Sequence, residues 1–468
     1  MKVRSRISWI AWALVALVLA VGVGACGDDD DAGSTSSSST AAESGDGLKG
    51  QTVRLWIMPN GPDPKNDIDK LLDPFEAKTG ITVDTEIVGW DVMQDRIRNA
   101  AVSGEGPDIT QAGTTQVPFF AALQGFEDLS GRVEDIGGPE AYPDGVWSTT
   151  QVSGQDGTWA VPWFTEARAI YYRKDVLKKA GVAEEGAFAD WDAMTATLQA
   201  IKDEVPEIGG KPIQPFGSPG KKAYDLVHHV MPFVWDAGGA ELSEDNAKST
   251  INSPEAQQGV AYFADLLQKG LYDKSQLQRD GTQVENQFKG GRIAVWMGGP
   301  WTYASTARDD DENWVPEARE NVGIAPMPTA PGGSEGYTFV GGSNLMMFKS
   351  AKNKDAAWEV MKQLSSDEFQ TQYAELLGMF PSRSEPQQAI ADKDPGYQSW
   401  YDAIQQGRTY APIPQWAQIE NAYKAHFGNI LDAAGGLGGG SFGPQTVTAQ
   451  LDAAAKEADA LLAQSAGG

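Results

Sequence analysis

Apolar and polar residues alternate in two stretches near the start of the folded part of the chain, at residues 53–57 and 81–87. Such alternation predicts half-buried strands. Between the two stretches, apolar residues over positions 68–75 recur at the spacing of a helix, and Gly80 ends that run. The pattern therefore predicts strand, helix and strand, which is typical of a parallel or mixed sheet covered by helices.

Further along the chain the apolar spacing is mostly helical. Helices are predicted over residues 93–101, 354–365 and 447–462. Another is predicted over residues 253–267, where Ser253 is a typical N-cap and Pro254 takes the first helical position. The alternation of strands and helices predicts the α/β fold class.

A short buried strand end is predicted in the segment PDITQAG at residues 107–113. Ligands of open α/β sheets bind at the carboxyl ends of the strands. We therefore expect a ligand near the loops at residues 58–63 and 109–116.

The first 25 residues have the layout of an export signal. Three basic residues precede nineteen uncharged ones over positions 7–25. The run ends in Val-Gly-Ala-Cys at residues 23–26, which resembles the lipobox of bacterial lipoproteins. That resemblance implies a signal peptide over residues 1–25 and lipidation of Cys26; a buried free thiol or an uncleaved membrane anchor is the alternative.

Residues 26–50 are rich in Gly, Ser and Asp and offer little to a hydrophobic core. We expect them to form a disordered tether between the lipidated Cys26 and the folded part. The predicted location is extracytoplasmic, anchored to the cell membrane.

Composition excludes several classes of function. The chain of 468 residues has 64 acidic and 37 basic side chains, a formal charge of -27 that repels nucleic acid. Cys26 is the single cysteine, so the chain can form no internal disulfide and no cysteine-based zinc site. The 15 Trp residues must line either a core or a ligand site.

Motifs for catalysis or for cofactors are not supported by their surroundings. The glycine-rich stretch at residues 438–443 matches a nucleophile elbow and a dinucleotide fingerprint, but a helical pattern precedes it where both motifs need a strand. We interpret it as a loop between two helices. No cofactor, metal site or catalytic residue is predicted.

Two further clusters receive a structural interpretation. His228 and His229 are adjacent on a predicted helix and point about 100° apart, so we expect one buried and one exposed ring. The acidic run at residues 309–312 lacks the ligand spacing of a calcium loop and is expected to be solvated. A secreted glycosidase stays open as an alternative, since it needs only two suitably spaced carboxylates.

Seven segments together resemble the sugar-binding lipoproteins of bacterial ABC importers, the solute-binding family that includes maltose-binding protein. They are GEGPDITQAG, WAVPWFTEARAIYYRKDVLKKAGV, INSPEAQQGVAYFADLLQKG, FKGGRIAVWMGGPW, VGGSNLMMFKSAKNKDAAWEVMKQL, LLGMFPSR and IPQWAQIENAY. The resemblance covers nearly all of residues 51–463. It implies the two-lobed periplasmic-binding-protein fold of type II, a ligand in the cleft between the lobes, delivery to an ABC permease, and no catalysis; we expect a monomer.

The same resemblance implies where the chain crosses between lobes, near residues 162–168, 324–328 and 364–368. One lobe would comprise residues 51–163 and 327–365. The other would comprise residues 166–324 and 366–468.

A sugar ring offers an apolar face and a rim of hydroxyls, so its site needs aromatic platforms and planar polar groups. The segments that the resemblance places at the cleft supply both. The stacking candidates are Trp163, Trp235, Trp301 and Trp416, and the polar candidates are Asp108, Gln111, Glu166, Arg168 and Asn344. For each ring ordinary packing is the alternative, and Trp358, on the apolar stripe of a helix, is assigned to the core.

Two other ligand classes are possible. The pair Tyr171-Tyr172 is similar to the tandem tyrosines of ferric-ion binders, but it falls in a strand-to-helix segment, so strand packing is predicted. A phosphate ester would require cations in the cleft, and Arg168 is the one cation among the candidates. A neutral mono- or oligosaccharide is therefore preferred, with a phosphate ester as the alternative.

Overall fold

The computed structural model describes residues 47–221, 223, 225–333 and 336–465. The predicted signal peptide, Cys26 and most of the predicted tether lie outside the described residues. Within the described ranges, no helix has the length and apolar character needed to cross a membrane.

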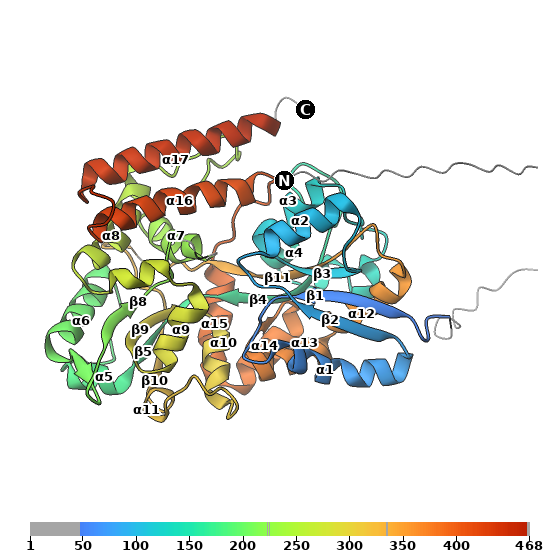
Figure 1. Cartoon of the computed structure of the whole chain (residues 1–468), viewed down its shortest axis with the longest axis horizontal. Coiled ribbons are helices and arrows are strands. Elements are labelled where there is room, and N and C mark those ends of the chain that lie inside the picture. Colours follow the sequence, from blue (N-terminus) through green and yellow to red (C-terminus); the bar gives the residue numbers. More distant parts are fainter. Residues whose placement is uncertain (1–46, 222, 224, 334–335, 466–468) are drawn as a thin grey trace, which may run out of the picture. The chain divides into compact units, whose positions relative to one another are not determined.

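One lobe is built on a six-stranded sheet (Figure 1). Its strands, in spatial order, are β12 (Phe380–Pro381), β4 (Val161–Ala167), β11 (Val340–Met347), β3 (Ile109–Gly113), β1 (Thr52–Ile57) and β2 (Thr82–Ile87). The strand β1 runs parallel to β2 and β3, whereas β11 runs antiparallel to β3 and β4. The three strands predicted from this part of the sequence are confirmed. We call this half the six-stranded lobe.

Helices cover both faces of the six-stranded sheet. They include α1 (Pro64–Thr79), α2 (Met93–Ser103), α3 (Val117–Ala122), α4 (Asp144–Ser148), α12 (Lys354–Leu364) and α13 (Asp367–Leu377). The apolar stripe of α1 packs in one core with α12 and α13, and that of α2 packs in another core with α3. Trp358 lies in the first of these cores, as predicted, and donates its indole N–H to Asp135 Oδ2 at 2.8 Å.

The other lobe is built on a four-stranded sheet with the order β10 (Val322–Ala325), β5 (Ala169–Arg173), β9 (Ile293–Gly298) and β8 (Gln214–Gly217). Around it lie α5 (Lys174–Lys179), α6 (Trp191–Glu204), α7 (Leu226–Asp236), α8 (Pro254–Gln268), α9 (Gly281–Lys289), α16 (Trp416–Ala434) and α17 (Pro444–Ser465). Figure 1 shows α16 and α17 side by side, and both contact α8. We call this half the four-stranded lobe.

Local chemistry explains where these helices begin. Ser253 accepts a hydrogen bond from the backbone N–H of Ala256 and Pro254 is the first residue of α8, as predicted. The glycine-rich stretch connects α16 to α17, also as predicted. The prediction for Tyr171 and Tyr172 is confirmed too, because both lie buried in β5.

Two expectations about burial are wrong. His228 and His229 are both buried, because α7 is covered on all sides rather than on one stripe. The acidic run is not fully solvated, since Asp311 is 1% exposed and pairs with Lys289 Nζ at 3.0 Å. A buried cation attracts one acid of the run into the protein, while its neighbours face water.

The chain passes directly from one sheet to the other at Arg168, between β4 and β5. It returns between β10 and β11. Beyond α12, residues Phe369, Tyr373 and Leu377 of α13 belong to the core of the six-stranded lobe. The helices α10 (Pro300–Ala304), α14 (Ser384–Lys393) and α15 (Pro395–Gln406) contribute to a further core with β5 and β9. The exact lobe boundaries stay a prediction.

Candidate ligand site

The crossing between the lobes carries an ion pair beside an indole ring. Arg168 Nη1 lies 3.0 Å from Glu166 Oε1, and the guanidinium lies 4.8 Å from the ring centroid of Trp301. Burial raises the pKa of Glu166, and the charge of Arg168 opposes that rise. Three of the predicted site residues therefore lie together, and Arg168 Nε has no hydrogen-bond partner among the described residues.

The indole ring of Trp301 is held in place by the buried carboxylate of Glu285. Its indole N–H donates to Glu285 Oε2 at 3.2 Å, and Thr302 Oγ1 donates to Glu285 Oε1 at 2.9 Å. Lys289 Nζ, one turn along α9, lies 3.0 Å from the same carboxylate. These contacts fix the plane of the half-buried Trp301 ring, which a stacking platform requires.

A second aromatic group lies in the four-stranded lobe and includes Trp235 and Trp416. Tyr410 stacks on Trp416 with ring centroids 4.3 Å apart and lies 5.5 Å from Trp235. Phe339 stacks on Tyr410 at 5.1 Å and on the imidazole of His228 at 4.0 Å. We call these five rings the aromatic cluster.

Gly341 lies between the ion pair and the aromatic cluster. A Cβ atom at this position would lie 2.4 Å from Phe339 Cε1 and 3.5 Å from Glu166 Oε1. A side chain would therefore collide with the Phe339 ring. Because Gly341 has no side chain, the aromatic cluster can approach the ion pair of Glu166 and Arg168.

Glu420 joins the aromatic cluster from α16. Its Oε1 lies 3.4 Å from His228 Nε2, and His228 Nδ1 lies 3.1 Å from the hydroxyl of Tyr410. Burial raises the pKa of Glu420 to about 8, opposed by the charge of Lys424. Burial also lowers the pKa of His228 well below its usual range. At neutral pH we therefore interpret the contact as one between two uncharged groups.

In the six-stranded lobe, Gln111 anchors a polar network. Its side chain exchanges hydrogen bonds with Asn60 at 3.0 and 3.2 Å and donates to Ser343 Oγ at 2.8 Å. Asn60 also donates to the hydroxyl of Tyr373 at 3.0 Å, and Tyr373 stacks on Trp163 at 5.1 Å. Trp163 is 0% exposed and its indole N–H has no hydrogen-bond partner in the described part of the chain.

Asp108 and Asn344 lie apart from these groups. The carboxylate of Asp108 accepts from the backbone N–H groups of Arg54 and Lys352 at 2.8 and 3.0 Å, so it ties β1 to the segment after β11. Asn344 donates to Thr149 Oγ1 at 2.9 Å. Residues alternate between faces along β11, so Asn344 lies on the face opposite to that of Ser343 and Gln111.

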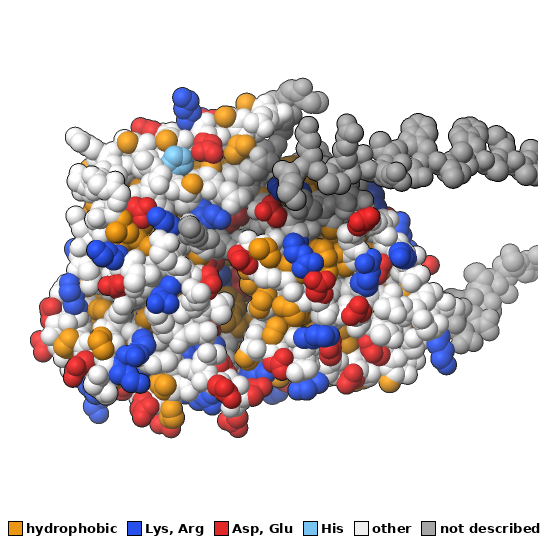
Figure 2. Space-filling view, in the orientation of Figure 1, with side chains coloured by type: hydrophobic (Ala, Val, Ile, Leu, Met, Phe, Trp, Pro, Cys, Tyr) orange, Lys and Arg blue, Asp and Glu red, His pale blue; other side chains and the backbone are white. Residues whose placement is uncertain are grey.

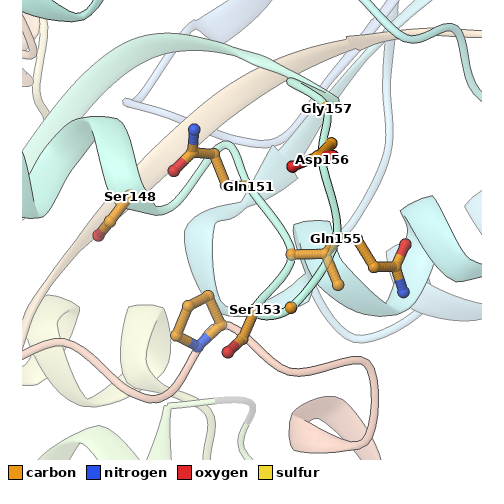
Figure 3. A pocket seen from close by; sticks show the side chains of 9 residues that line it. Ser148, Gln151, Ser153, Gln155, Asp156 and Gly157 are labelled. Atoms are coloured by element: carbon orange, nitrogen blue, oxygen red, sulfur yellow. The ribbon is translucent and has the colours of Figure 1, made fainter.

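A polar hollow of about 350 Å³ lies beside the segment that leads to Trp416 (Figure 3). Its lining includes Ser148 at the end of α4, Gln151, Gln155 and Asp156 from the loop between α4 and β4, and Pro412. None of the predicted site residues lines this hollow. Its hydroxyl, amide and carboxylate groups are suited to hydrogen-bonding a sugar.

The two lobes touch at several points around these groups. Asp67 of α1 receives two hydrogen bonds from Arg308, at 2.8 and 3.2 Å, and both side chains are less than a tenth exposed. Elsewhere the backbone N–H of Ser153 donates to Pro412 O at 2.8 Å. Figure 2 shows the surface hollowed between the regions of α9 and α1.

Sequence reasoning did not identify Phe339, Tyr410, Glu420 or Gly341. Tyr410 lies in the proline-containing segment TYAPIPQW, and Glu420 follows Trp416 by four residues, so both carried a usable signal. Phe339 gave no such signal, because it joins the aromatic cluster through a β-bridge to Arg408, which lies far along the chain. No group of three or more potential metal ligands is found in the described residues.

Comparisons with known proteins agree with this architecture. A family model for bacterial extracellular solute-binding proteins matches residues 60–371. The diacetylchitobiose binding protein DasA of Streptomyces coelicolor is 27% identical over 382 residues, which cover 80% of this chain and 83% of DasA. The maltodextrin-binding protein MdxE of Bacillus subtilis is 24% identical over 430 residues, covering 90% of this chain and 92% of MdxE.

Solved structures share the fold. A solute-binding protein from Thermotoga lettingae bound with α-D-tagatose superposes with a TM-score of 0.76 at 23% identity, covering 88% of this chain and 100% of that one. Maltose-bound MalE3 of T. maritima also gives a TM-score of 0.76, at 21% identity, covering 88% of this chain and 99% of its own. The predicted two-lobed fold is confirmed. With the family model matched over 60–371, the chain belongs to the bacterial extracellular solute-binding protein family.

Proposed function

We propose that this protein binds a neutral mono- or oligosaccharide between its lobes and delivers it to an ABC permease. The observation that carries the proposal is the group at the crossing between the lobes, in which the half-buried ring of Trp301 lies beside the polar side chains of Glu166 and Arg168, with the guanidinium 4.8 Å from the ring centroid. An indole face packs against the C–H face of a sugar, and a planar carboxylate or guanidinium group can hydrogen-bond two of its hydroxyls at once. DasA and MdxE are both named for saccharide ligands, which supports the same substrate class.

The charges near the crossing favour a neutral ligand. Arg168 pairs with Glu166, and Lys289 pairs with Glu285 and Asp311. Arg308 pairs with Asp67 and Asp310. A phosphate ester that used one of these cations would compete with the carboxylate already paired to it. The phosphate-ester alternative is therefore less favoured than a sugar.

We further propose binding without turnover and anchoring through a lipidated Cys26. The family consists of binding proteins, which supports the first statement. A maltooligosaccharide ABC transporter solute-binding lipoprotein of Streptococcus pneumoniae, 22% identical over 387 residues, supports the second. If the protein binds without turnover, a bound oligosaccharide should be recovered intact after long incubation.

If Cys26 is lipidated, labelling with fatty acid should disappear in Cys26→Ser. Labelling of the variant would contradict the proposal of a lipid anchor.

The function is tested by a thermal-shift screen of the folded part with neutral saccharides, followed by calorimetry on any hit. The screen contains N-acetylated and non-acetylated disaccharides, maltooligosaccharides and, as anionic controls, sugar phosphates. A ligand at about 100 times its Kd stabilises the fold by about 2.7 kcal/mol. Stabilisation by the sugar phosphates alone would overturn the proposal.

Trp301→Ala is the matching variant. It should weaken the Kd of the saccharide by about 5- to 150-fold, because stacking of a base on an aromatic side chain, the analogous contact, contributes about 1 to 3 kcal/mol. Trp56→Ala is the control: Trp56 lies on β1, donates to Glu86 at 2.8 Å and carries the guanidinium of Arg96 at 4.4 Å. An unchanged Kd in Trp301→Ala would remove this ring from the site.

A further inference from the structure

The helix α16 presents two buried polar groups that have no hydrogen-bond partner. Trp416 and Glu420 are four residues apart, so they lie on one face of the helix. Trp416 is 0% exposed and Glu420 is 4% exposed. Among the described residues, neither Trp416 Nε1 nor Glu420 Oε1 has a hydrogen-bond partner. Buried polar groups are usually paired, so this donor and this acceptor on one helix face are free to bond a ligand.

Glu420 contacts the aromatic cluster, but its Oε1 forms no hydrogen bond with it. The distance of 3.4 Å between Glu420 Oε1 and His228 Nε2 is longer than an ordinary hydrogen bond. His228 is engaged at its other nitrogen with Tyr410, and Tyr410 stacks on Trp416. The carboxyl group is therefore close to the stacking ring and keeps bonding capacity.

The six-stranded lobe has a third unpaired group in an element that contacts the same helix. The short helical turn η1 (Thr114–Gln116), directly after β3, contacts α16. Gln116 is 2% exposed and its Oε1 has no hydrogen-bond partner in the described part of the chain. Unpaired buried polar groups of the two lobes thus occur in two elements that contact each other.

The surroundings of Glu420 contain both signs of charge. Lys424 lies on its own helix, and the imidazoles of His228 and His229 come from α7. Arg168 at the crossing and Asp225 before α7 act on those imidazoles. Burial outweighs the attraction of Lys424, so the pKa of Glu420 is about 8 and the group is uncharged at neutral pH.

We propose that Glu420 is a specificity-determining residue of the ligand site: its carboxyl group hydrogen-bonds a hydroxyl of a neutral sugar stacked near Trp416 and disfavours sugars that carry a carboxylate. This inference rests on the proposed function and names the neutral members of that substrate class. A carboxylate placed next to Glu420 in a buried site either forces Glu420 to stay protonated or faces a like charge. A neutral hydroxyl can donate to Glu420 in either protonation state, and it can accept from Glu420 when that group is protonated.

The test compares a neutral saccharide identified by the screen with its uronic-acid counterpart, by calorimetry at pH 6, 7.5 and 9. The variants are Glu420→Gln, which keeps the shape and cannot ionise, and Glu420→Ala, which removes the bonding group. Glu76→Gln is the control, because Glu76 accepts a hydrogen bond from the backbone of Val83 in the six-stranded lobe. Melting curves establish that each variant is folded.

Wild type should bind the neutral sugar with a preference over the uronate that grows by about tenfold from pH 6 to pH 9. Glu420→Gln should keep the neutral affinity within about threefold and lose the pH dependence of the preference. Glu420→Ala should weaken the neutral sugar about tenfold, the effect of one lost hydrogen bond. A structural defect would weaken both ligands equally and leave their ratio unchanged.

Two outcomes overturn the inference and are distinguishable. If wild type binds a neutral sugar but Glu420→Gln shows the same preference at every pH, Glu420 does not face the ligand and the proposed function stands. If wild type binds no saccharide in the screen, the proposed function and the inference both fail.

Discussion

Glu420 and Asp236 are two carboxyl groups of the four-stranded lobe that the fold removes from water. Burial raises the pKa of each to about 8. A free carboxyl of either kind titrates near pH 4. The folded state therefore holds these protons over a pH range in which the unfolded chain has released them, and stability must depend on pH.

We expect the free energy of unfolding to fall as pH rises from about 4.5 to about 8, because the folded pKa values lie above the unfolded ones. In Glu420→Gln the loss of unfolding free energy over this pH range should be smaller by on the order of 3 to 5 kcal/mol. A difference of one between the folded and unfolded pKa corresponds to about 1.36 kcal/mol. Urea unfolding between pH 5 and pH 9 measures the effect. Parallel pH profiles for wild type and variant would show that Glu420 titrates normally.

Single side chains also mark the limit of what the sequence could reveal. Trp416 follows Pro412 and Pro414, a pattern typical of the start of a helix, and α16 begins at that residue. The burial of both His228 and His229 could not be foreseen, because one stripe of the α7 pattern gives no information on what covers the other stripes. Which of these rings contacts a ligand stays a prediction.

At the scale of elements, the best-predicted parts are those with local signals. The strands β1 and β2 and the helix α8 follow from alternation, helical spacing and an N-cap, all readable within some fifteen residues. The aromatic cluster needs Phe339 from the start of β11, Tyr410 from the segment before α16, and His228 from α7. Contacts between residues so far apart in the sequence depend on the order of the strands in each sheet. The periodicity of a single sequence gives no information on that order.

The start of α16 should serve both stability and binding. Trp416 packs face to face with Tyr410 and edge-on to Tyr423 at 6.1 Å. Trp416→Ala should lower the free energy of unfolding by about 3 to 5 kcal/mol, the usual cost of truncating a core Trp, and should weaken ligand binding as Tyr410 loses its support. The burial of the ring thus adds a stability cost to the loss of affinity expected from the sequence.

Trp416→Phe separates the two roles of that ring. Phenylalanine keeps most of the packing and removes the indole N–H, so stability should recover largely while the ligand affinity stays reduced. Urea unfolding and calorimetry on the same preparations make the comparison. Full recovery of affinity in Trp416→Phe would show that the indole N–H does not bind ligand.

At the scale of the whole molecule, the described structure shows the lobes in contact, and one buried ion pair accounts for part of that contact. Arg308, in the segment that follows β9 and α10, binds Asp67 of α1 through two hydrogen bonds. It also pairs with Asp310 at 2.7 Å, so its guanidinium is held in place for Asp67. An ion pair between the lobes favours the form in which the lobes are in contact over a form in which they separate.

We expect Asp67→Asn to shift the ligand-free protein toward an open form, because it removes one charge from a buried pair whose disruption costs about 3 to 5 kcal/mol. The radius of gyration without ligand should rise in the variant, and adding the saccharide should reduce it in both proteins. Lys65→Ala, which removes an exposed pair with Asp69 on the same helix, is the control. Small-angle scattering measures the radius, and calorimetry should find a weaker Kd for Asp67→Asn, since part of the binding free energy must then close the lobes. Equal radii for wild type and Asp67→Asn in the absence of ligand would mean that the pair stabilises the local packing of α1 rather than the closed form.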